Sequence, residues 1–498
     1  MQQTSLFQTP SEQFLLQCFS ADHFCDDKER IALEQKYAPF LQVTDKFNRK
    51  NVSYQLSKNE VLHSWLKYKE GFSADLVNLL LSEMRIKPND LVMDPFMGSG
   101  TTALVCQMRG INSIGYDIMP ISSIAIKAKS ACLTYNICEL EQMLRDIRAL
   151  SIPSGYTHKT PHIKITEDAY PEETSRFLQF ITEWKDESPY SELAKNLLTL
   201  CIINSLESIS YTVKSGQYLS WDYRSPKVRN ANLLRQQKGQ KLLPQKKLKD
   251  EILPAKDTII TEFSHVINDI RIIQSSTSHP FTSKITYIQN SSLYEIPKLP
   301  SNYINGVITS PPYCNRYDYT RTYALELVYL GLTDNDIKNM RQSLLSCTVE
   351  SHSKVAQLNA FYKSINQEKR FKYILDKIKS NAAFTEILNA LRKRKEHKDL
   401  NNNGVIRMVE GYFTELAFLY AELYRVCKPG SSVAFVNDDV RYGGEVIPVD
   451  FLCTSFAEEF GFKVKTIYTL KQKKGNSSQQ MAKFGKVPLR KGITIWEK

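Results

Sequence analysis

Hydrophobic and polar positions change their period several times along the chain, and these changes predict an α/β fold. Residues 71–84 (GFSADLVNLLLSEM) have apolar side chains at helical spacing, and Ser73 stands where it can cap the first turn. Residues 89–110 (NDLVMDPFMGSGTTALVCQMRG) indicate a strand, a glycine-rich turn and a second helix. The apolar run at residues 111–117 then predicts a short strand that ends in an acid.

The same alternation returns in the second half of the chain. Residues 284–290 and 304–309 are strand-like, and an amphipathic helix that closes at Lys428-Pro429-Gly430 leads into another apolar strand. Residues 462–498 indicate two strands joined by a basic loop. We therefore expect a mostly parallel, doubly wound sheet with a terminal hairpin, and such sheets bind ligands beyond the carboxyl ends of their strands.

Two long stretches interrupt the α/β pattern. The first is largely helical with a strongly basic segment, and the second is a lysine-rich helical stretch. We expect the following division of the chain: an N-terminal helical segment (1–52), a first part of the catalytic core with the cofactor site (53–130), an insertion (131–283), a second core part (284–335), a helical insertion (336–404) and a third core part (405–498).

The charge of the chain favours a polyanionic partner. The 498 residues carry a net charge of +12, and the isoelectric point is near 9.0. Arg224–Lys249 contains nine Lys and Arg residues and no acid, and Tyr218, Trp221 and Tyr223 lie beside it. Such a run is often a solvated surface, but cations interleaved with aromatic rings also suit phosphates and bases. The candidate nucleic-acid contacts are Trp221, Arg224, Lys227, Arg229, Arg316, Lys473 and Lys474.

Other classes of protein fit the sequence less well. The ten cysteines include no C-x-x-C pair, which argues against a zinc site and against a secreted disulfide framework. The N-terminus has no signal-peptide pattern, and no apolar stretch approaches the length of a membrane span. We therefore expect a soluble, cytoplasmic protein without a metal.

The glycine-rich turn is a candidate cofactor site. Gly98 and Gly100 stand where a strand turns into a helix, and Asp117 ends the next strand, where it can accept hydrogen bonds from ribose hydroxyls. This pattern fits both a dinucleotide and S-adenosylmethionine, whereas a P-loop would need a lysine after the glycines. Asp94 favours S-adenosylmethionine, because a carboxylate there can neutralise the α-amino group of that cofactor but would repel a pyrophosphate.

The second candidate site is the proline-locked corner Ser310-Pro311-Pro312-Tyr313. The Ser310 hydroxyl and the Pro311 carbonyl offer two rigid acceptors for the two hydrogens of an exocyclic amine on a nucleobase. Holding both hydrogens makes the amine nitrogen a better nucleophile. The Tyr313 ring can stack on a base that has left its helix.

The two motifs together resemble those of the amino-methyltransferases of DNA, which act on N4 of cytosine or N6 of adenine. DPFMGSGTT resembles the cofactor motif of that family, TSPPY its catalytic motif, and Lys67–Val77 the segment before the cofactor turn. The resemblance implies a Rossmann-like methyltransferase fold, S-adenosylmethionine as methyl donor and base flipping. It implies cofactor contacts at Phe72, Ser73, Asp94, Pro95, Phe96, Gly98, Gly100, Thr101, Asp117 and Asn290, and catalytic roles for Ser310, Pro311, Pro312 and Tyr313.

Two departures from the family leave questions open. Asn290 stands where the family often has an acid that contacts adenine, and the long insertion precedes the strand that ends there. Target recognition is therefore expected in residues 131–283, in residues 336–404, or in both.

We expect a site-specific methyltransferase of double-stranded DNA, with a cognate restriction endonuclease as a candidate partner. Ser310 before Pro-Pro favours N4 of cytosine over N6 of adenine, since a neutral hydroxyl suffices for the less hindered amine. C5-cytosine chemistry is excluded because the chain has no Pro-Cys pair. The alternatives are a methyltransferase of RNA bases or of protein glutamine, an inactive nucleic-acid-binding relative and, more remotely, a dinucleotide oxidoreductase.

Overall fold

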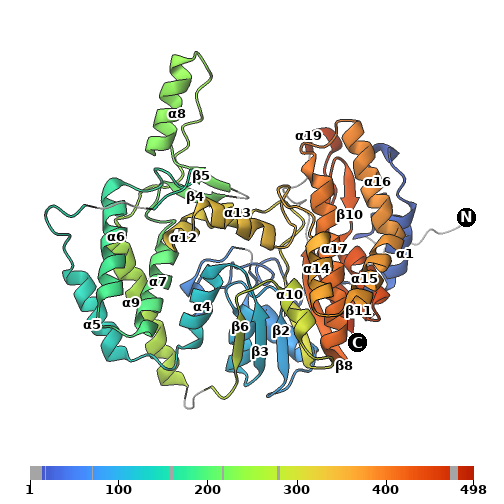
Figure 1. The fold of residues 1–498 in the computed structure, drawn as a ribbon, viewed down its shortest axis with the longest axis horizontal. Coiled ribbons are helices and arrows are strands. Elements are labelled where there is room, and N and C mark those ends of the chain that lie inside the picture. Colours follow the sequence, from blue (N-terminus) through green and yellow to red (C-terminus); the bar gives the residue numbers. More distant parts are fainter. Residues whose placement is uncertain are drawn as a thin grey trace, which may run out of the picture.

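An eight-stranded sheet forms the centre of the molecule (Figure 1). The computed structural model describes residues 14–498 except 17, 70, 158–160, 216–217, 278–280 and 472–480. All neighbouring strands of this sheet run parallel, except for the two pairs that contain β12. The strands, in spatial order, are β1 (Leu41–Thr44), β11 (Lys463–Leu470), β12 (Lys491–Glu497), β8 (Cys427–Asp438), β7 (Ile304–Thr309), β2 (Leu91–Asp94), β3 (Asn112–Tyr116) and β6 (Ile285–Ile288). The predicted doubly wound sheet with a terminal hairpin is confirmed.

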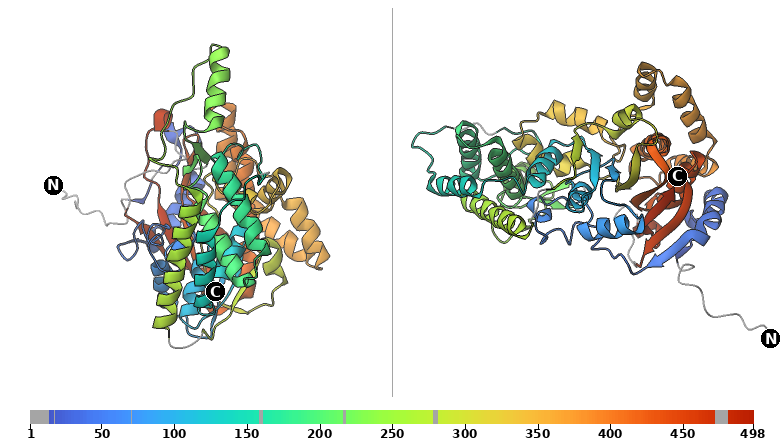
Figure 2. Two further views of the ribbon diagram at one scale, coloured as in Figure 1. Left: turned by 90° about the vertical axis from the view of Figure 1, so that its left-hand side faces the viewer. Right: turned by 90° about the horizontal axis from the view of Figure 1, so that it is seen from below.

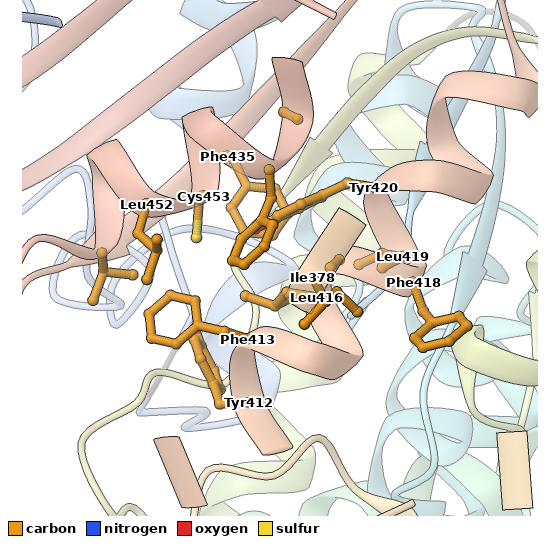
Figure 3. Close-up of a cluster of buried hydrophobic side chains, with 14 of the residues drawn as sticks. Ile378, Tyr412, Phe413, Leu416, Phe418, Leu419, Tyr420, Phe435, Leu452 and Cys453 are labelled. Carbon is orange, nitrogen blue, oxygen red and sulfur yellow. The ribbon is translucent and has the colours of Figure 1, made fainter. Parts of the chain in front are cut away.

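Helices cover both faces of the sheet, and the strands are accordingly apolar on both sides. On one face α2 (Ala74–Glu83) and α3 (Thr101–Met108) pack against side chains such as Val92, Ile308 and Ala434. On the other face α17 (Gly404–Val426) and α18 (Val449–Glu459) pack against the alternate side chains of the same strands, such as Met93 and Phe435. Figure 3 shows the aromatic and aliphatic side chains of α17 meeting Phe435 and the side chains of α18. This core fixes the strands whose carboxyl ends carry the two motifs.

The first insertion forms a helical lobe beside the sheet (Figures 1 and 2). Its helices are α5 (Ile137–Ala149), α6 (Glu172–Glu187), α7 (Glu192–Ser205) and α9 (Ala255–Ser276). The lobe joins the core where α7 packs on α4 (Pro120–Ser130), and its buried apolar side chains form one cluster with those of α4. A small hairpin, β4 (Thr212–Ser215) and β5 (Tyr218–Trp221), leads from this lobe into α8 (Pro226–Gln237).

The second insertion has four helices, α13 (Asp334–Ser343), α14 (Val355–Ser364), α15 (Glu368–Ser380) and α16 (Ala382–Glu396). Of these, α14, α15 and α16 lie on the side of the sheet opposite the first lobe, where α15 and α16 pack on α17, whereas α13 packs on α11 between the two sides (Figure 1). None of the helices in the part of the chain that the structure describes is both long and apolar enough to cross a lipid bilayer. The remaining elements are α1 (Lys28–Tyr37), α10 (Ser292–Glu295), α11 (Tyr319–Thr322), α12 (Ala324–Tyr329), α19 (Met481–Phe484), β9 (Val440–Tyr442), β10 (Glu445–Ile447) and the short 3-10 helices η2 (Ala21–His23), η3 (Ala38–Phe40), η4 (His63–Trp65) and η5 (Ile296–Lys298).

The N-terminal segment differs from the helical one that the sequence predicts. It contains α1, but Leu41–Thr44 forms strand β1, which pairs in parallel with β11 at the edge of the sheet. Four residues are too few to establish a period of two, so the strand could not be distinguished from a loop in the sequence. The N-terminal segment therefore contributes an edge strand to the sheet as well as a helix.

Candidate active site

The turn after β2 brings the backbone close to a pocket. Gly98 and Gly100 both have positive φ, +53° and +86°, and Gly100 precedes the first turn of α3. A Cβ at Gly98 would lie 3.0 Å from the Tyr68 ring, and one at Gly100 would lie 2.8 Å from Ile126. Glycine is thus required at both positions for conformation as well as for space.

Asp117, directly after β3, holds this turn in place. One of its carboxylate oxygens accepts a hydrogen bond from Gly98 N at 2.8 Å and the other accepts one from Met119 N at 2.8 Å. Burial raises the pKa of Asp117, and these backbone donors counteract that effect. An ionised carboxylate has about four lone-pair positions, so both oxygens can still accept hydrogen bonds from ribose hydroxyls.

Asp94 is the buried acid at the end of β2. Its Oδ1 accepts hydrogen bonds from Thr309 Oγ1 at 2.7 Å and from Phe96 N at 3.0 Å. Burial raises the pKa of Asp94 to about 6, although these hydrogen bonds oppose the shift. A cation placed beside this carboxylate would stabilise its ionised form. The bond from Thr309 also ties β2 directly to the strand that carries the second motif.

The proline corner follows β7, the parallel neighbour of β2. Ser310 Oγ–H donates to Tyr313 Oη at 3.2 Å and also lies 3.5 Å from the Val436 carbonyl oxygen. Lys491 Nζ lies 5.1 Å from the centre of the Tyr313 ring and 3.1 Å from Asp438 Oδ1. Because the Ser310 proton points at neighbouring oxygens, the lone pairs of its oxygen are suited to accept an amine hydrogen.

One pocket of about 780 Å³, its open mouth included, connects the two motifs. Of the predicted site residues, those that line it are Phe72, Asp94, Pro95, Phe96, Gly98, Thr101, Asp117, Asn290, Ser310 and Pro312. An acid with free lone pairs, a buried carboxylate and a close backbone approach are the features that the ribose, the α-amino group and the rest of S-adenosylmethionine need. The residues present fit that cofactor.

Four predicted site residues are not part of the pocket wall. Ser73 is fully buried and caps α2 by accepting from Leu76 N, and Gly100 packs against Ile126. Pro311 and Tyr313 lie in the corner itself, where Tyr313 is 9% exposed. Ser73 and Gly100 thus support the shape of the loop rather than line the pocket.

Several lining residues did not stand out in the sequence. Tyr68 lines the pocket and stacks on Tyr323, with ring centres 5.2 Å apart. Tyr319 and Leu344 and Leu345 close the pocket from α11 and from the end of α13. Tyr68 belongs to the segment 67–77 that resembles the family, and this membership could have indicated its role. Leu344 and Leu345 come from an insertion, where no motif indicates them. Cys314, beside the corner, is buried, and burial raises the pKa of its thiol.

None of the predicted nucleic-acid contacts that the structure describes lines the pocket, and several have partners within the protein. Arg224 pairs with Asp222 at 2.8 Å, and Lys227 donates to the Lys164 carbonyl at 2.7 Å while lying over the Trp221 ring. Arg316 donates to Asn401 Oδ1 at 2.9 Å. Arg229 is exposed on α8, and Lys473 and Lys474 lie outside the described residues.

The family profile and the relatives that match this chain are all methyltransferases. Residues 20–126 match the sequence profile of a family described as DNA methylase. The type II methyltransferase M.BsoBI of Geobacillus stearothermophilus is 49% identical over 488 residues, which cover 98% of this chain and 96% of that protein. The type II methyltransferase M.AvaI of Nostoc sp. is 37% identical over 488 residues, with 96% and 95% covered. These two matches extend over nearly the whole chain, the insertions included.

Proposed function

The chain belongs to the amino-group methyltransferases of DNA, within the type II class, and on that basis we propose that it transfers a methyl group from S-adenosylmethionine to the N4 amino group of cytosine in double-stranded DNA. The observation that carries this proposal is the single pocket lined by Asp94, Asp117 and Ser310. An amine held at the proline corner there faces a donor held at the glycine turn.

The residues at the cofactor end of the pocket bind and orient S-adenosylmethionine. S-adenosylmethionine, when bound, supplies an electrophilic methyl group on a sulfonium. Asp117 accepts from the ribose hydroxyls, and Asp94 pairs with the α-ammonium group. Phe72 and Phe96 add apolar surface to the wall. Since Asp117 and Asp94 are already fixed by hydrogen bonds from Gly98 N and Thr309, little reorganisation accompanies binding.

The proline corner activates the nucleophile. The Ser310 hydroxyl and the Pro311 carbonyl accept the two amine hydrogens and direct the nitrogen lone pair out of the plane of the base. With S-adenosylmethionine held by Asp117 and Asp94, its methyl group would pass to the amine nitrogen held at Ser310 and Pro311, and the amine proton released would go to solvent water. The acceptor array needs no covalent intermediate, in agreement with the burial of the Cys314 thiol.

The target base reaches the pocket after it has been flipped out of the duplex. Chemistry at an exocyclic amine inside a base pair is sterically blocked, so the base must be flipped, and Tyr313 replaces part of the lost stacking. Ser310 is a neutral acceptor, which favours the less hindered N4 of cytosine. A restriction–modification system, with an endonuclease that reads the same sequence, is the setting that fits the names of the relatives.

One labelling experiment tests the function. The protein is incubated with S-adenosylmethionine labelled in its methyl group and with plasmid DNA or RNA, and the nucleic acid is digested to nucleosides. Label in N4-methyldeoxycytidine is the expected result. Label in N6-methyldeoxyadenosine would overturn the choice of base while leaving the family assignment intact, and label in RNA alone would overturn the substrate.

A further inference from the structure

A basic arm projects from the first insertion. We define it as Arg224–Lys249, which comprises α8 and the segment that returns alongside it. Figures 1 and 2 show α8 extending beyond the β4–β5 hairpin and clear of the rest of the fold. Val228 is the one α8 residue that is buried, and the tip residues are exposed. An element with so little packing contributes little to the stability of the fold and is a candidate for external contacts.

The root of the arm is held firmly. Arg224 donates to Asp222 and to the Lys249 carbonyl at 2.8 Å in both cases, so it links the two ends of the arm. Lys249 Nζ donates to the Ser210 carbonyl at 2.7 Å, and Ser225 caps α8 by accepting from Val228 N. Midway along the arm, Leu243 N donates to Asn232 Oδ1 at 2.7 Å. The arm therefore has a defined shape despite its exposure.

The tip presents both positive charge and leucines. The arm carries nine of the twelve net positive charges of the chain and contains no acid. Leu233 and Leu234 are 58% and 56% exposed, and Leu242 is 45% exposed. Leucines this exposed bury little apolar surface against the described part of the chain, and exposed large apolar side chains grouped on one element suit an external contact.

The charge identifies the occupant. A second copy of this chain would bring its own basic arm and its own net positive charge, whereas duplex DNA carries one negative charge per roughly 1.7 Å of its axis. Leucines at a protein–DNA contact can press into the minor groove or against sugars. An α-helix also fits the width of the major groove.

The position of the arm relates it to the pocket. Tyr319 in α11 lines the pocket, α11 packs on β5, and the arm begins directly after β5. The twelve residues of α8 then extend the arm by roughly 18 Å from this root. The root of the arm therefore lies close to one wall of the pocket, within reach of a duplex that has one base in the pocket.

We propose that the basic arm grips duplex DNA outside the recognition sequence, through phosphate contacts from Arg229, Lys238 and Lys241 and apolar contacts from Leu233 and Leu234. The inference rests on the proposed function, because it takes a flipped base in the pocket as the anchor of the duplex. The arm adds affinity that does not depend on sequence.

Two variants and one matched control test the arm. The first variant is Arg229→Gln, Lys238→Gln and Lys241→Gln together. The second variant replaces residues 232–243 by Gly-Gly-Ser. The hydrogen bond between Asn232 and Leu243 shows that the two ends of this segment are close together, so a three-residue linker can join them. The control is Lys87→Gln, Lys284→Gln and Lys463→Gln, which removes the same charge from exposed lysines at the amino ends of β2, β6 and β11.

The substrates are duplexes built around the site that the wild-type protein methylates in plasmid DNA, with about three or about fifteen flanking base pairs on each side. On the long duplex, the first variant should bind on the order of tenfold more weakly at physiological salt, and the slope of log K against log salt should fall by about two to three. On the short duplex, the variant, the control and the wild type should bind and methylate equally.

Several outcomes separate the possibilities. Equal binding of the long duplex by both variants and the wild type would overturn the proposal. A change in sedimentation with Leu233→Ser and Leu234→Ser, without a change in DNA binding, would overturn it in favour of a second copy of the chain. Absence of methylation from every DNA substrate, with the wild type included, would instead overturn the proposed function itself.

Discussion

The two ends of the pocket are built differently. At the glycine turn, Asp117 is fixed by backbone N–H groups of Gly98 and Met119, and Asp94 is fixed by Phe96 N and Thr309. At the proline corner, side-chain contacts hold the acceptor, since Ser310 donates to Tyr313 and Lys491 lies over the Tyr313 ring. One end holds its acids with hydrogen bonds that are mostly from the backbone, and the other presents a side-chain acceptor on a proline-fixed backbone.

This difference separates binding from chemistry. A receptor whose acids are oriented by the backbone loses affinity when the backbone changes, whereas a corner of side chains loses rate when an acceptor is removed. Substitutions at the two ends should therefore affect different constants. The four predictions that follow use this separation, from the largest effect to the smallest.

Ser310→Ala removes the hydroxyl acceptor and should lower turnover by about 10²- to 10³-fold, the usual result of deleting one group that stabilises a transition state. Cofactor affinity, measured by calorimetry, should stay at the wild-type value, because Ser310 lies at the other end of the pocket. Tyr313→Phe is the control, since it removes the hydroxyl that Ser310 contacts but keeps the ring. Full turnover in Ser310→Ala would refute the role of this serine as acceptor.

Gly98→Val should weaken cofactor binding by roughly 10- to 100-fold through backbone strain and a clash with Tyr68. Gly155→Val is the matched control, because Gly155 also has positive φ but has open space around its Cβ position. Thermal unfolding of both variants reports the strain, and calorimetry reports the affinity. If both variants bound the cofactor like the wild type, the turn could not be the receptor.

Cofactor affinity should decrease as the pH falls through about 6. Burial raises the pKa of Asp94 to about 6, so the carboxylate is ionised above this pH and attracts the α-ammonium, and it becomes neutral below it. Below this pKa, cofactor affinity should fall by at most about tenfold for each pH unit. Calorimetry between pH 5 and 8 measures it, and Asp94→Asn should bind weakly with a flat profile. An unchanged profile in Asp94→Asn would assign the titration to another group, with Asp117 the nearest candidate.

Lys491→Met should have the smallest effect, about twofold to fivefold on the KM for DNA. Lys491 restrains Tyr313 from one side and pairs with Asp438 directly across the sheet. Loss of the cation would leave Tyr313 less well positioned to stack on the base. Initial rates at varied DNA concentration provide the test, and a change in cofactor affinity instead of KM for DNA would contradict the division between the two ends.

The sequence predicted the sheet and its two loops well because both depend on local signals. Gly98, Gly100 and the Pro311–Pro312 pair each impose a backbone geometry that neighbouring residues cannot override. The parallel order of β2 and β7 then brings the loops together, and the short apolar runs Leu91–Met93 and Val307–Ile308 indicated those strands. Leu344 and Leu345 could not be predicted in this way, since they reach the pocket from the end of α13 in an insertion.

Basic composition says less about a site than backbone geometry does. In the helical insertion 336–404, which stays a candidate DNA-binding region, Arg370 pairs with Glu422 and Arg394 pairs with Glu445. Lys354 and Glu415 form a buried pair at 2.8 Å. These acids lie in α17 and β10, some 50 residues or more along the chain, so the sequence could not reveal that the cations have partners. In the acid-free stretch Arg224–Lys249, the cations at the root have partners within the protein, whereas Arg229, Lys238 and Lys241 are exposed.

The hydrogen bond between Thr309 and Asp94 has a consequence for the gene rather than for the enzyme. Its two residues are 215 positions apart in the chain, but they sit at the tips of adjacent strands. The pocket requires that these two strands lie side by side. This arrangement does not depend on which of the two motifs comes first in the chain. Evolution could therefore exchange the two halves by circular permutation, and the rearranged gene would encode the same catalytic centre.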